Sequence, residues 1–499
     1  MKRLSLATLG DMSPAIARPA YDPRLIPVGI VHLGIGAFHR AQTAVYSDDA
    51  LAKAPGPWGI CGVSLRSADV RDRLVPQDGL YTSVEKSPQG VRRRVIGSVR
   101  EVLFLGADRE RIQARLHAPA TEIVSLTVTE KGYCHDPASG GLNFAHPDIV
   151  HDLADSTRPL SAVGLIVAAL DARRASRARG FTVLCCDNLP HNGALLRGLA
   201  LAFAQERDPA LAHWIEDNAS FPSTMVDRIV PATTDSDIAD NDRALGLRDA
   251  APVVHEPFKQ WVIEDRFVAG RPAWDRVGVQ FVADVAPFEA MKLRLLNASH
   301  SAFAYLGYLA GHEFIYQVAA QPNFVAFMRR LMKEEVAPTL KLPAGVDVGA
   351  YQNALVERFG NPALPHRTQQ IAMDGSQKLP QRMLGTVRDN LATGRSIELL
   401  TLAVAGWMRY VSGSDEAGRE IKVSDPLAAD FARIGAAHPG DPAGLAAGLL
   451  SLSAIFGNDL PADPRFAAKV EGWLTAMFRD GAARTVARAA GARSDEQKP

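Results

Sequence analysis

The stretch VGIVHLGIGAFHRAQTAVYSDDAL, residues 28–51, decides how the N-terminal half of the chain is interpreted. Its first six residues form a short apolar run, which predicts a buried β-strand. Gly34 and Gly36 follow, and the segment from about Phe38 to Leu51 is typical of a helix. A strand, a glycine turn and a helix in this order are the setting that a dinucleotide-binding fingerprint requires.

The glycine turn predicts a site for the pyrophosphate of a dinucleotide. Glycines allow a tight turn and a close backbone approach, so that N–H groups at the start of the helix can face the phosphates. We expect Gly34, Gly36 and Phe38 to contact the cofactor. The third fingerprint position holds His39 instead of glycine. A plain strand, turn and helix without a ligand is the alternative.

The second strand predicts which dinucleotide is bound. The run WGICGVSLR should end near Arg66, and an acidic residue near this point normally binds the ribose hydroxyls of adenosine. Asp69 is the candidate, although it could instead cap a helix or be a surface charge. Arg66 could favour a ribose 2′-phosphate, or it could stack on the adenine ring. We favour NAD as the cofactor.

The order of patterns along the 499 residues predicts two domains. Strand-like runs alternate with helical segments up to about Val285, and an almost purely helical period begins near Pro287. The expected fold is α/β: a Rossmann-type, NAD-binding domain over residues 1–286, followed by a mainly α-helical substrate and catalytic domain over residues 287–499. Residues 491–499 are expected to form a frayed tail.

The composition argues against several classes of partner. Lysine plus arginine equals aspartate plus glutamate at 55 each, so a general nucleic-acid or membrane-surface binder is not expected. The four cysteines form no C-x-x-C pair and no zinc-ligand spacing, which predicts no metal site and a reduced, cytoplasmic setting. We expect neither a signal peptide nor a membrane span. The oligomeric state stays open.

A second informative stretch is MKLRLLNASH, residues 291–300. With about 100° of rotation per helical residue, several side chains should share one broad face. These are Glu289, Lys292, Leu293, Leu296, Asn297 and His300. A lysine among leucines is costly to bury in its charged form, so its pKa is expected to fall. A neutral amine is a competent general base, and an asparagine amide can donate to an alkoxide that forms beside it.

The same stretch has a structural interpretation. Lys292 could reach solvent through its flexible stem, His300 could be a satisfied core histidine, and Asn297 could serve helix packing. The tyrosine and lysine pair of short-chain dehydrogenases is absent, because no tyrosine is followed by lysine four residues later. If the protein transfers hydride, a lysine base is therefore the remaining candidate.

Six blocks of the sequence resemble the mannitol dehydrogenase family, the long-chain, metal-independent polyol and sugar-acid 2-dehydrogenases. They occur in the family's order, and the resemblance extends from about residue 17 to residue 480. The blocks are GIGAFHRAQ, SLTVTEKGYC, CDNLPHNG, FPSTMVDRIVPAT, EPFKQWVIED and KLRLLNASH. The resemblance implies a Rossmann-type domain, a helical domain and an active site in the cleft between them.

The resemblance also implies catalytic roles. The K-x(4)-N-x(2)-H motif of the family falls on Lys292, Asn297 and His300, where the lysine is the general base and the histidine orients the substrate. Asn188 of the CDN block completes an oxyanion pair with Asn297. Glu289 matches a carboxylate that exchanges the proton with solvent.

Two further positions concern the substrate. Asp227 of the MVDR block matches a ligand of substrate hydroxyls, and Lys378 matches a lysine that contacts substrate. Mannitol enzymes carry arginine eight residues before that lysine, whereas this chain has Gln370, and the surrounding stretch resembles the mannonate oxidoreductases, or fructuronate reductases. A uronate carboxylate needs a cationic partner, for which Lys378 and Arg367 are the candidates.

The favoured function is therefore an NAD-dependent D-mannonate/D-fructuronate oxidoreductase acting on a secondary alcohol. A mannitol 2-dehydrogenase or related polyol dehydrogenase is the alternative. A catalytically silent NAD-binding sensor on the same fold is a remote third possibility, against which the presence of Lys292, Asn188, Asn297 and His300 speaks.

Overall fold

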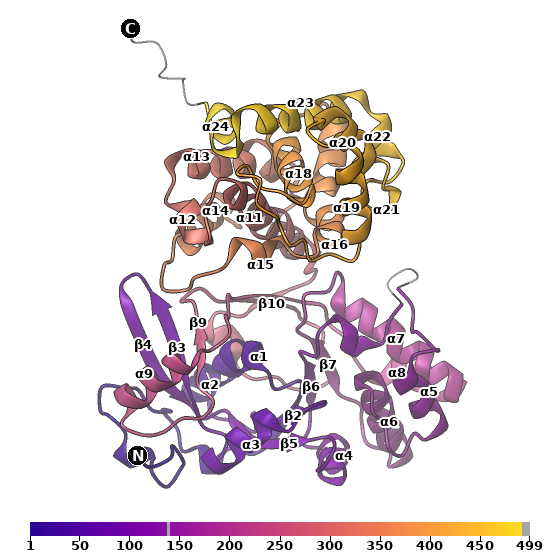
Figure 1. Ribbon diagram of the computed structural model, residues 1–499. Coiled ribbons are helices and arrows are strands. Elements are labelled where there is room, and N and C mark those ends of the chain that lie inside the picture. Colours follow the sequence, from indigo (N-terminus) through magenta and orange to yellow (C-terminus); the bar gives the residue numbers. More distant parts are fainter. Residues whose placement is uncertain (137–139, 492–499) are drawn as a thin grey trace. The chain divides into compact units, whose positions relative to one another are not determined.

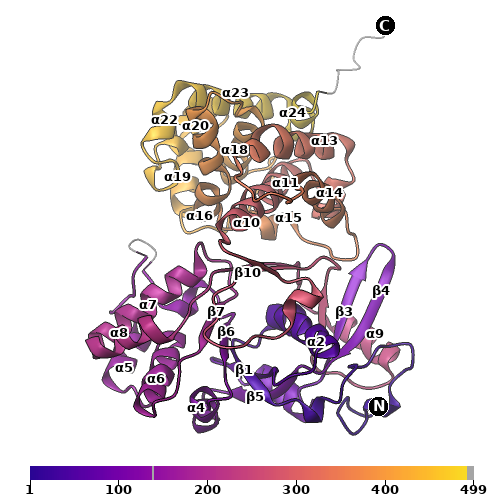
Figure 2. The ribbon, with the colours of Figure 1, turned by 180° about the vertical axis from the view of Figure 1, so that it is seen from behind.

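The computed structural model describes residues 1–136 and 140–491 (Figures 1 and 2). It divides into two compact units, Met1–Ala286 and Pro287–Pro499. The frayed tail that the sequence predicts lies, from residue 492 onward, outside the described residues. Within the described ranges, no helix combines the length and the apolar character that crossing a membrane requires.

A five-stranded parallel sheet forms the centre of the N-terminal unit, with strand order β5-β2-β1-β6-β7. The strands are β1 (Val28–Leu33), β2 (Gly59–Ser64), β5 (Val99–Phe104), β6 (Ile123–Leu126) and β7 (Thr182–Cys185). The order reverses between β1 and β6. In open α/β sheets, ligands bind at the carboxyl ends of the strands at such a switch point. This sheet confirms the Rossmann-type prediction.

Helices cover one face of this sheet (Figure 2). Val31 and Leu33 of β1 point into a core that these helices line with apolar side chains. The helices are α4 (Arg109–His117), α5 (Pro147–Ala154), α6 (Ala162–Ala175), α7 (Asn192–Arg207) and α8 (Pro209–Asn218). Because alternate residues of a strand face opposite sides, Ile30 points into a second core on the other face. Burial on both sides explains the continuous apolar runs of the strands.

The second face is covered by helices and two small sheets. The helices are α1 (Ala37–Ala41), α2 (Thr43–Lys53) and α3 (Asp69–Leu74). Helix α9 (Asp235–Leu245) contributes Leu245 to a separate small core with Leu4 and Met12. One three-stranded sheet has the order β4-β3-β9, with β3 (Tyr81–Ser87), β4 (Gly90–Ile96) and β9 (Val253–His255). The other has the order β11-β10-β8, with β8 (Thr224–Asp227), β10 (Gln260–Glu264) and β11 (Gln280–Val282).

The helix expected from about Phe38 to Leu51 is two helices. The chain leaves helical geometry at Gln42, where φ is −116° and ψ is −82°. The buried Gln42 amide donates to the backbone carbonyl of Gln260, 2.7 Å away. This partner lies far along the chain, so local sequence does not reveal the break.

The C-terminal unit is helical, as predicted, and no strand is assigned to it over residues 287–491. Helix α18 (Glu398–Val411) is buried from Leu399 to Val411 and packs against α11 (Ala298–Leu309) and α23 (Pro464–Asp480). A helix that is apolar all round belongs in the interior of a bundle.

Shorter helices surround this core. They are α10 (Ala286–Met291), α12 (Ile315–Ala319), α13 (Pro322–Arg330), α14 (Val348–Phe359), α15 (Thr368–Ala372), α16 (Gly375–Leu379), α17 (Gly385–Ala392), α19 (Ala428–Ala437), α20 (Pro442–Leu450), α21 (Ser453–Phe456), α22 (Asp459–Ala462) and α24 (Ala482–Ala489). Within residues 287–491, π-helical segments are Lys292–Asn297, Leu331–Val336 and Pro380–Leu384. Short 3₁₀ turns are Leu9–Asp11, Pro23–Leu25, Val75–Gln77, Glu130–Tyr133, Trp274–Val277 and Ala337–Thr339.

Candidate functional site

The two glycines after β1 have different reasons to be glycine. Gly34 has φ +95°, and a Cβ atom there would lie 2.1 Å from the carbonyl oxygen of Thr127. The fold itself therefore requires Gly34. Gly36 has φ −79° and is exposed, and the nearest atom to a Cβ there would be 3.9 Å away. The fold has room for a side chain at Gly36. Because glycine has none, this space is open to a ligand at the start of α1.

His39, at the third fingerprint position, takes part in the packing between strand and helix. Its ring stacks on the ring of His32 with 3.4 Å between centroids. Its Nδ1 lies 2.5 Å from the hydroxyl of Thr43, and both histidines are fully buried. Burial holds the pKa of His39 well below its ordinary value and lowers that of His32 to about 3. A neutral histidine pair thus fills the position where a third glycine would allow closer packing.

The segment after β2 carries the two charged residues that could select the cofactor, and it places them in different surroundings. Asp69 is exposed in the first turn of α3, where an acidic side chain also favours the helix. Arg66 is ion-paired with Asp148 of α5, and this hydrogen bond raises the pKa of Arg66. Arg66 is therefore already engaged by a carboxylate of its own chain.

The carboxyl ends of β6 and β7 are joined by Asp187, which the sequence analysis did not single out. Its carboxylate accepts hydrogen bonds from the Val128 amide at 2.8 Å and the Thr129 amide at 3.2 Å. It also accepts one from the Tyr133 hydroxyl at 2.6 Å. Burial raises the pKa of Asp187, and these hydrogen bonds oppose that shift. Asp187 therefore fixes the backbone immediately before Asn188.

Asn192 is a second positioning residue that sequence reasoning missed. Its amide donates to the Asp187 carbonyl at 3.1 Å and to the Thr224 carbonyl at 2.9 Å, and its Oδ1 accepts from the Thr224 amide. Asn192 thereby connects the β7 loop, which carries Asn188, to β8, which ends at the buried Asp227. The signal available in the sequence was only that both residues lie in the block CDNLPHNG.

In the C-terminal unit, the lysine helix departs from the ideal geometry assumed above. Residues Lys292–Asn297 form a π-helical turn between α10 and α11, with the Ala298 amide donating to the Leu293 carbonyl five residues earlier. An ideal α-helix would place Lys292 and Asn297 about 140° apart, and the wider turn reduces this angle. π-turns inserted in α-helices occur frequently at functional sites. Lys292, Asn297 and His300 are all half-buried.

His300 presents an unused hydrogen-bonding atom. Its ring stacks on Phe359 with 4.9 Å between centroids, and its Nε2 is shielded from solvent without a hydrogen-bond partner among the described residues. Burial holds the pKa of His300 well below its ordinary value, and the neighbouring ring of His366 and the positive charges of Arg382, Arg358 and Lys378 lower it further. A buried polar atom without a partner marks a position that a ligand can satisfy.

Arg382 and Lys378 are held by oxygen atoms near this histidine. Arg382 donates to the Ser301 hydroxyl at 2.9 Å and to the Asn297 carbonyl at 3.3 Å, and burial lowers its pKa. Lys378 of α16 donates to the backbone carbonyls of Met373 and Ile371. Arg382 was missed in the sequence because its partners lie about 80 positions away.

Arg367 has the arrangement expected of a surface residue. It precedes α15 with extended backbone, so it does not share a helical face with Gln370. Its side chain is 60% exposed, is ion-paired with Glu313 and lies 5.1 Å from the centre of the Phe314 ring. Lys378 is therefore the better candidate for a cation that contacts substrate.

One group of three potential metal ligands occurs within residues 1–136 and 140–491: Cys134, His146 and Asp148. Two of these are engaged already. Asp148 is ion-paired with Arg66, and the Asp148 amide donates to Nδ1 of His146 at 3.2 Å. Both contacts compete with a metal ion for these side chains.

Comparison with protein families assigns both units. The profile of the mannitol dehydrogenase Rossmann domain matches residues 28–276, and that of the mannitol dehydrogenase C-terminal domain matches residues 284–478. The chain belongs to the mannitol dehydrogenase family. This membership makes it an oxidoreductase and confirms the family that the six sequence blocks predicted.

Individual members of the mannitol dehydrogenase family match over nearly the whole chain. A D-mannonate oxidoreductase of Escherichia coli (strain K12) is 49% identical and aligns over 97% of this chain and 100% of its own. A mannitol 2-dehydrogenase of Phaeosphaeria nodorum is 41% identical over 94% of this chain and 83% of its own. The solved ternary complex of Pseudomonas fluorescens mannitol 2-dehydrogenase with NAD and D-mannitol is 40% identical, with a TM-score of 0.85 over 98% of this chain and 100% of its own.

The buried histidines predict a loss of stability in acid. The folded pKa of His39 lies below its value of about 6.5 in the unfolded chain, so the unfolded state binds more protons as pH falls below 6.5. Each histidine that stays neutral in the folded state should lower the free energy of unfolding by about 1.4 kcal/mol when the pH falls from 7.5 to 5.5. We expect His39→Gln to remove one such increment from the pH dependence of unfolding by urea. The exposed His213 provides the control, because His213→Gln should keep the wild-type dependence of the free energy of unfolding on pH. If His39→Gln also kept the wild-type dependence, the conclusion that His39 stays neutral in the folded state would be contradicted.

Proposed function

We propose that this chain is an NAD-dependent, metal-independent 2-dehydrogenase that interconverts D-mannonate and D-fructuronate. The observation that carries the proposal is the setting of His300: its Nε2 lacks a partner among the described residues, and Arg358, Lys378 and Arg382 act on its ring electrostatically. Positive charges therefore act on the group that is proposed to orient the substrate.

The positive charge favours a sugar acid over a neutral polyol. A uronate brings a carboxylate, which is expensive to remove from water unless a cation receives it. A polyol has no such requirement, and mannitol enzymes carry arginine where this chain has Gln370. The 49% identity to a D-mannonate oxidoreductase agrees with a uronate substrate.

The glycine turn fits the pyrophosphate of NAD. Gly34 closes the turn against Thr127, and Gly36 leaves open space over the first N–H groups of α1. Bound NAD supplies the chemistry of accepting or returning a hydride at the substrate carbon. Asp69 offers a carboxylate for ribose hydroxyls, whereas Arg66 is held by Asp148 and so is less available for a 2′-phosphate.

Lys292 is the proposed general base. In the oxidative direction it removes the proton of the hydroxyl on the carbon that becomes the C2 ketone of fructuronate, and the amide groups of Asn188 and Asn297 donate to the alkoxide that develops. The neutral imidazole of His300 holds a substrate oxygen in line with Lys292 through its free Nε2. Glu289, on α10 one helical turn before Lys292, passes the proton to solvent.

Asp227 and Lys378 complete the proposed substrate contacts. The buried Asp227 accepts hydrogen bonds from substrate hydroxyls, and Lys378 pairs with the terminal carboxylate. Arg367 is not assigned this role, because Glu313 already pairs with it at the surface. The four cysteines are free and buried, in keeping with the proposed cytoplasmic setting.

Replacement of the base tests the mechanism. Lys292→Ala should lower kcat by at least about a hundredfold because the proton acceptor is lost, while NADH still binds. Turnover of fructuronate and quenching of NADH fluorescence are to be measured over the pH range. Lys333→Ala removes an exposed lysine from another π-turn of the same unit and should leave both unchanged. Wild-type turnover in Lys292→Ala would exclude the lysine as base.

The substrate class can be tested with a panel of ketoses. We expect NADH oxidation with fructuronate to be far faster than with fructose at equal concentration. Lys378→Met should lower kcat/KM for fructuronate by about ten- to a hundredfold, and that for fructose much less, because only the uronate loses an ion pair.

Two variants serve as controls for the substrate test. Arg367→Met removes the other cation that was considered as a partner of the uronate carboxylate, and Lys341→Met removes an exposed lysine of the same unit. Both should resemble the wild type. An enzyme that reduces fructose well and ignores fructuronate would favour the alternative, a mannitol 2-dehydrogenase. A protein that binds NADH but reduces no ketose would favour the silent sensor.

Cofactor choice depends on the charges after β2. The wild type should use NADH and discriminate against NADPH. Asp148→Asn should free Arg66 and raise the NADPH to NADH ratio of kcat/KM by about tenfold, the value of one charge-assisted contact. The double variant Asp148→Asn with Arg66→Gln should return to the wild-type ratio. Equal use of both cofactors by the wild type would refute the assignment of Asp69.

A further inference from the structure

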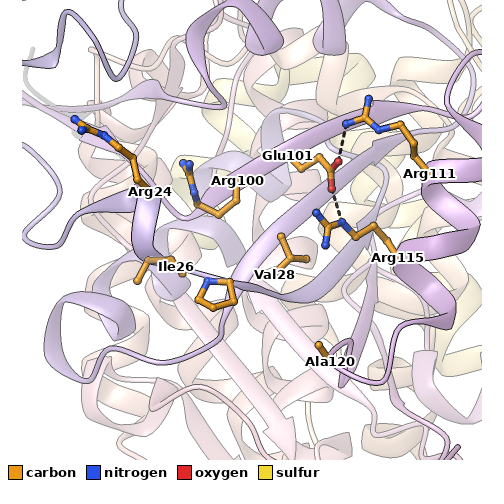
Figure 3. A pocket seen from close by; sticks show the side chains of 9 residues that line it. Arg24, Ile26, Val28, Arg100, Glu101, Arg111, Arg115 and Ala120 are labelled. Carbon is orange, nitrogen blue, oxygen red and sulfur yellow. Dashed lines mark hydrogen bonds and ion pairs between the residues drawn. The ribbon is translucent and has the colours of Figure 1, made fainter.

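A pocket of about 490 Å³ lies at the amino ends of strands β1 and β5 (Figure 3). This is the opposite end of the parallel strands from the glycine turn, so the pocket is separate from the dinucleotide site. Its lining combines four arginines and one glutamate with a small apolar surface. The residues are Arg24, Ile26, Pro27, Val28, Arg100, Glu101, Arg111, Arg115 and Ala120.

The single carboxylate of the lining is shared by two of the arginines. Glu101 pairs with Arg111 at 2.7 Å and with Arg115 at 2.6 Å, and Figure 3 shows the three side chains together on one side of the pocket. Arg111 also lies 3.4 Å from Asp108, which is not part of the lining, so Arg111 and Arg115 have their counter-charges from Glu101 and Asp108. Glu101 is therefore not available to neutralise the other arginines of the lining.

Arg100 is the cation that the fold leaves without a counter-charge. It is half-buried, and no carboxylate of residues 1–136 or 140–491 lies within ion-pair distance of it. Its one hydrogen bond is a weak one of 3.4 Å to the Val99 carbonyl. Burial lowers the pKa of Arg100, and the negative charges of Asp78 and Asp22, neither within ion-pair distance, offset this only in part.

The stem of Arg100 is accommodated by a glycine of the next strand. A Cβ atom at Gly59 of β2 would lie 2.6 Å from Cγ of Arg100. Arg24 is the second cation on the side of the pocket that carries Arg100 (Figure 3). It is 3.7 Å from Asp22, and both of these side chains are largely exposed. Such exposed pairs are weak and are readily exchanged for a better anion.

We propose that this pocket binds a small phosphate monoester, with its phosphoryl group on Arg100 and Arg24. Guanidinium groups match phosphate oxygens in charge and in geometry. The apolar side chains of Ile26, Val28 and Ala120 then receive the carbon skeleton of the ligand. The volume lies within the range of small-molecule sites, about 300–1,000 Å³, and exceeds the need of an inorganic phosphate ion alone.

Calorimetric titration of the enzyme saturated with NADH tests the site. The probes are glucose 6-phosphate, inorganic phosphate and glucose. We expect one equivalent of glucose 6-phosphate to bind, inorganic phosphate to bind more weakly, and glucose not to bind. Arg100→Gln should weaken the binding of glucose 6-phosphate by about tenfold or more, and Arg24→Gln by a smaller factor, because its charge is more exposed.

Arg243→Gln is the matched control, since it removes an exposed arginine elsewhere in the same unit. It should bind glucose 6-phosphate like the wild type. All three variants should retain NADH binding and turnover, which shows that they fold. Displacement of glucose 6-phosphate by NADH, no binding by the wild type, or equal affinities of Arg100→Gln and Arg243→Gln would overturn the proposal. Equal affinities for phosphate and glucose 6-phosphate would overturn the role of the apolar surface.

Discussion

The N-terminal unit depends on the close approach of the turn after β1 to the end of β6. Gly34 makes this possible, because its φ of +95° and its lack of a Cβ allow the Thr127 carbonyl to lie against it. The same two strands flank the point where the strand order reverses. The turn therefore brings the start of α1 and the loops after β6 and β7 to the edge of the sheet where dinucleotides bind.

Some polar residues of the chain support others that are candidates for the functional site. Asp187 and Asn192 bind backbone groups of neighbouring loops and so determine where Asn188 and Asp227 lie. In the C-terminal unit, Arg382 does the same for the π-turn by binding the Asn297 carbonyl. Such supporting contacts matter because a catalytic group displaced by about 1 Å can lose two orders of magnitude in rate.

Pairing decides which arginines of this chain can serve a ligand. Arg66 and Arg367 are bound by Asp148 and Glu313, so a ligand must compete with a carboxylate that is already in place. Arg100 has no such partner in the described part of the chain, and Arg382 is held by neutral oxygen atoms. An anionic ligand can therefore supply the counter-charge that the protein does not.

The sequence by itself determined the family, the Rossmann-type unit and the helical C-terminal unit. These rest on short-range patterns, such as the apolar run 28–33, the glycine turn and the helical period after Pro287, and local periodicity is visible in a single chain. Only the tertiary structure decided that the chain breaks at Gln42, that Lys292–Asn297 form a π-turn, and that Arg367 is paired while Arg100 is not. The reason is that each of these outcomes depends on partners, or on their absence, dozens to hundreds of positions away, and residue spacing carries no record of such contacts.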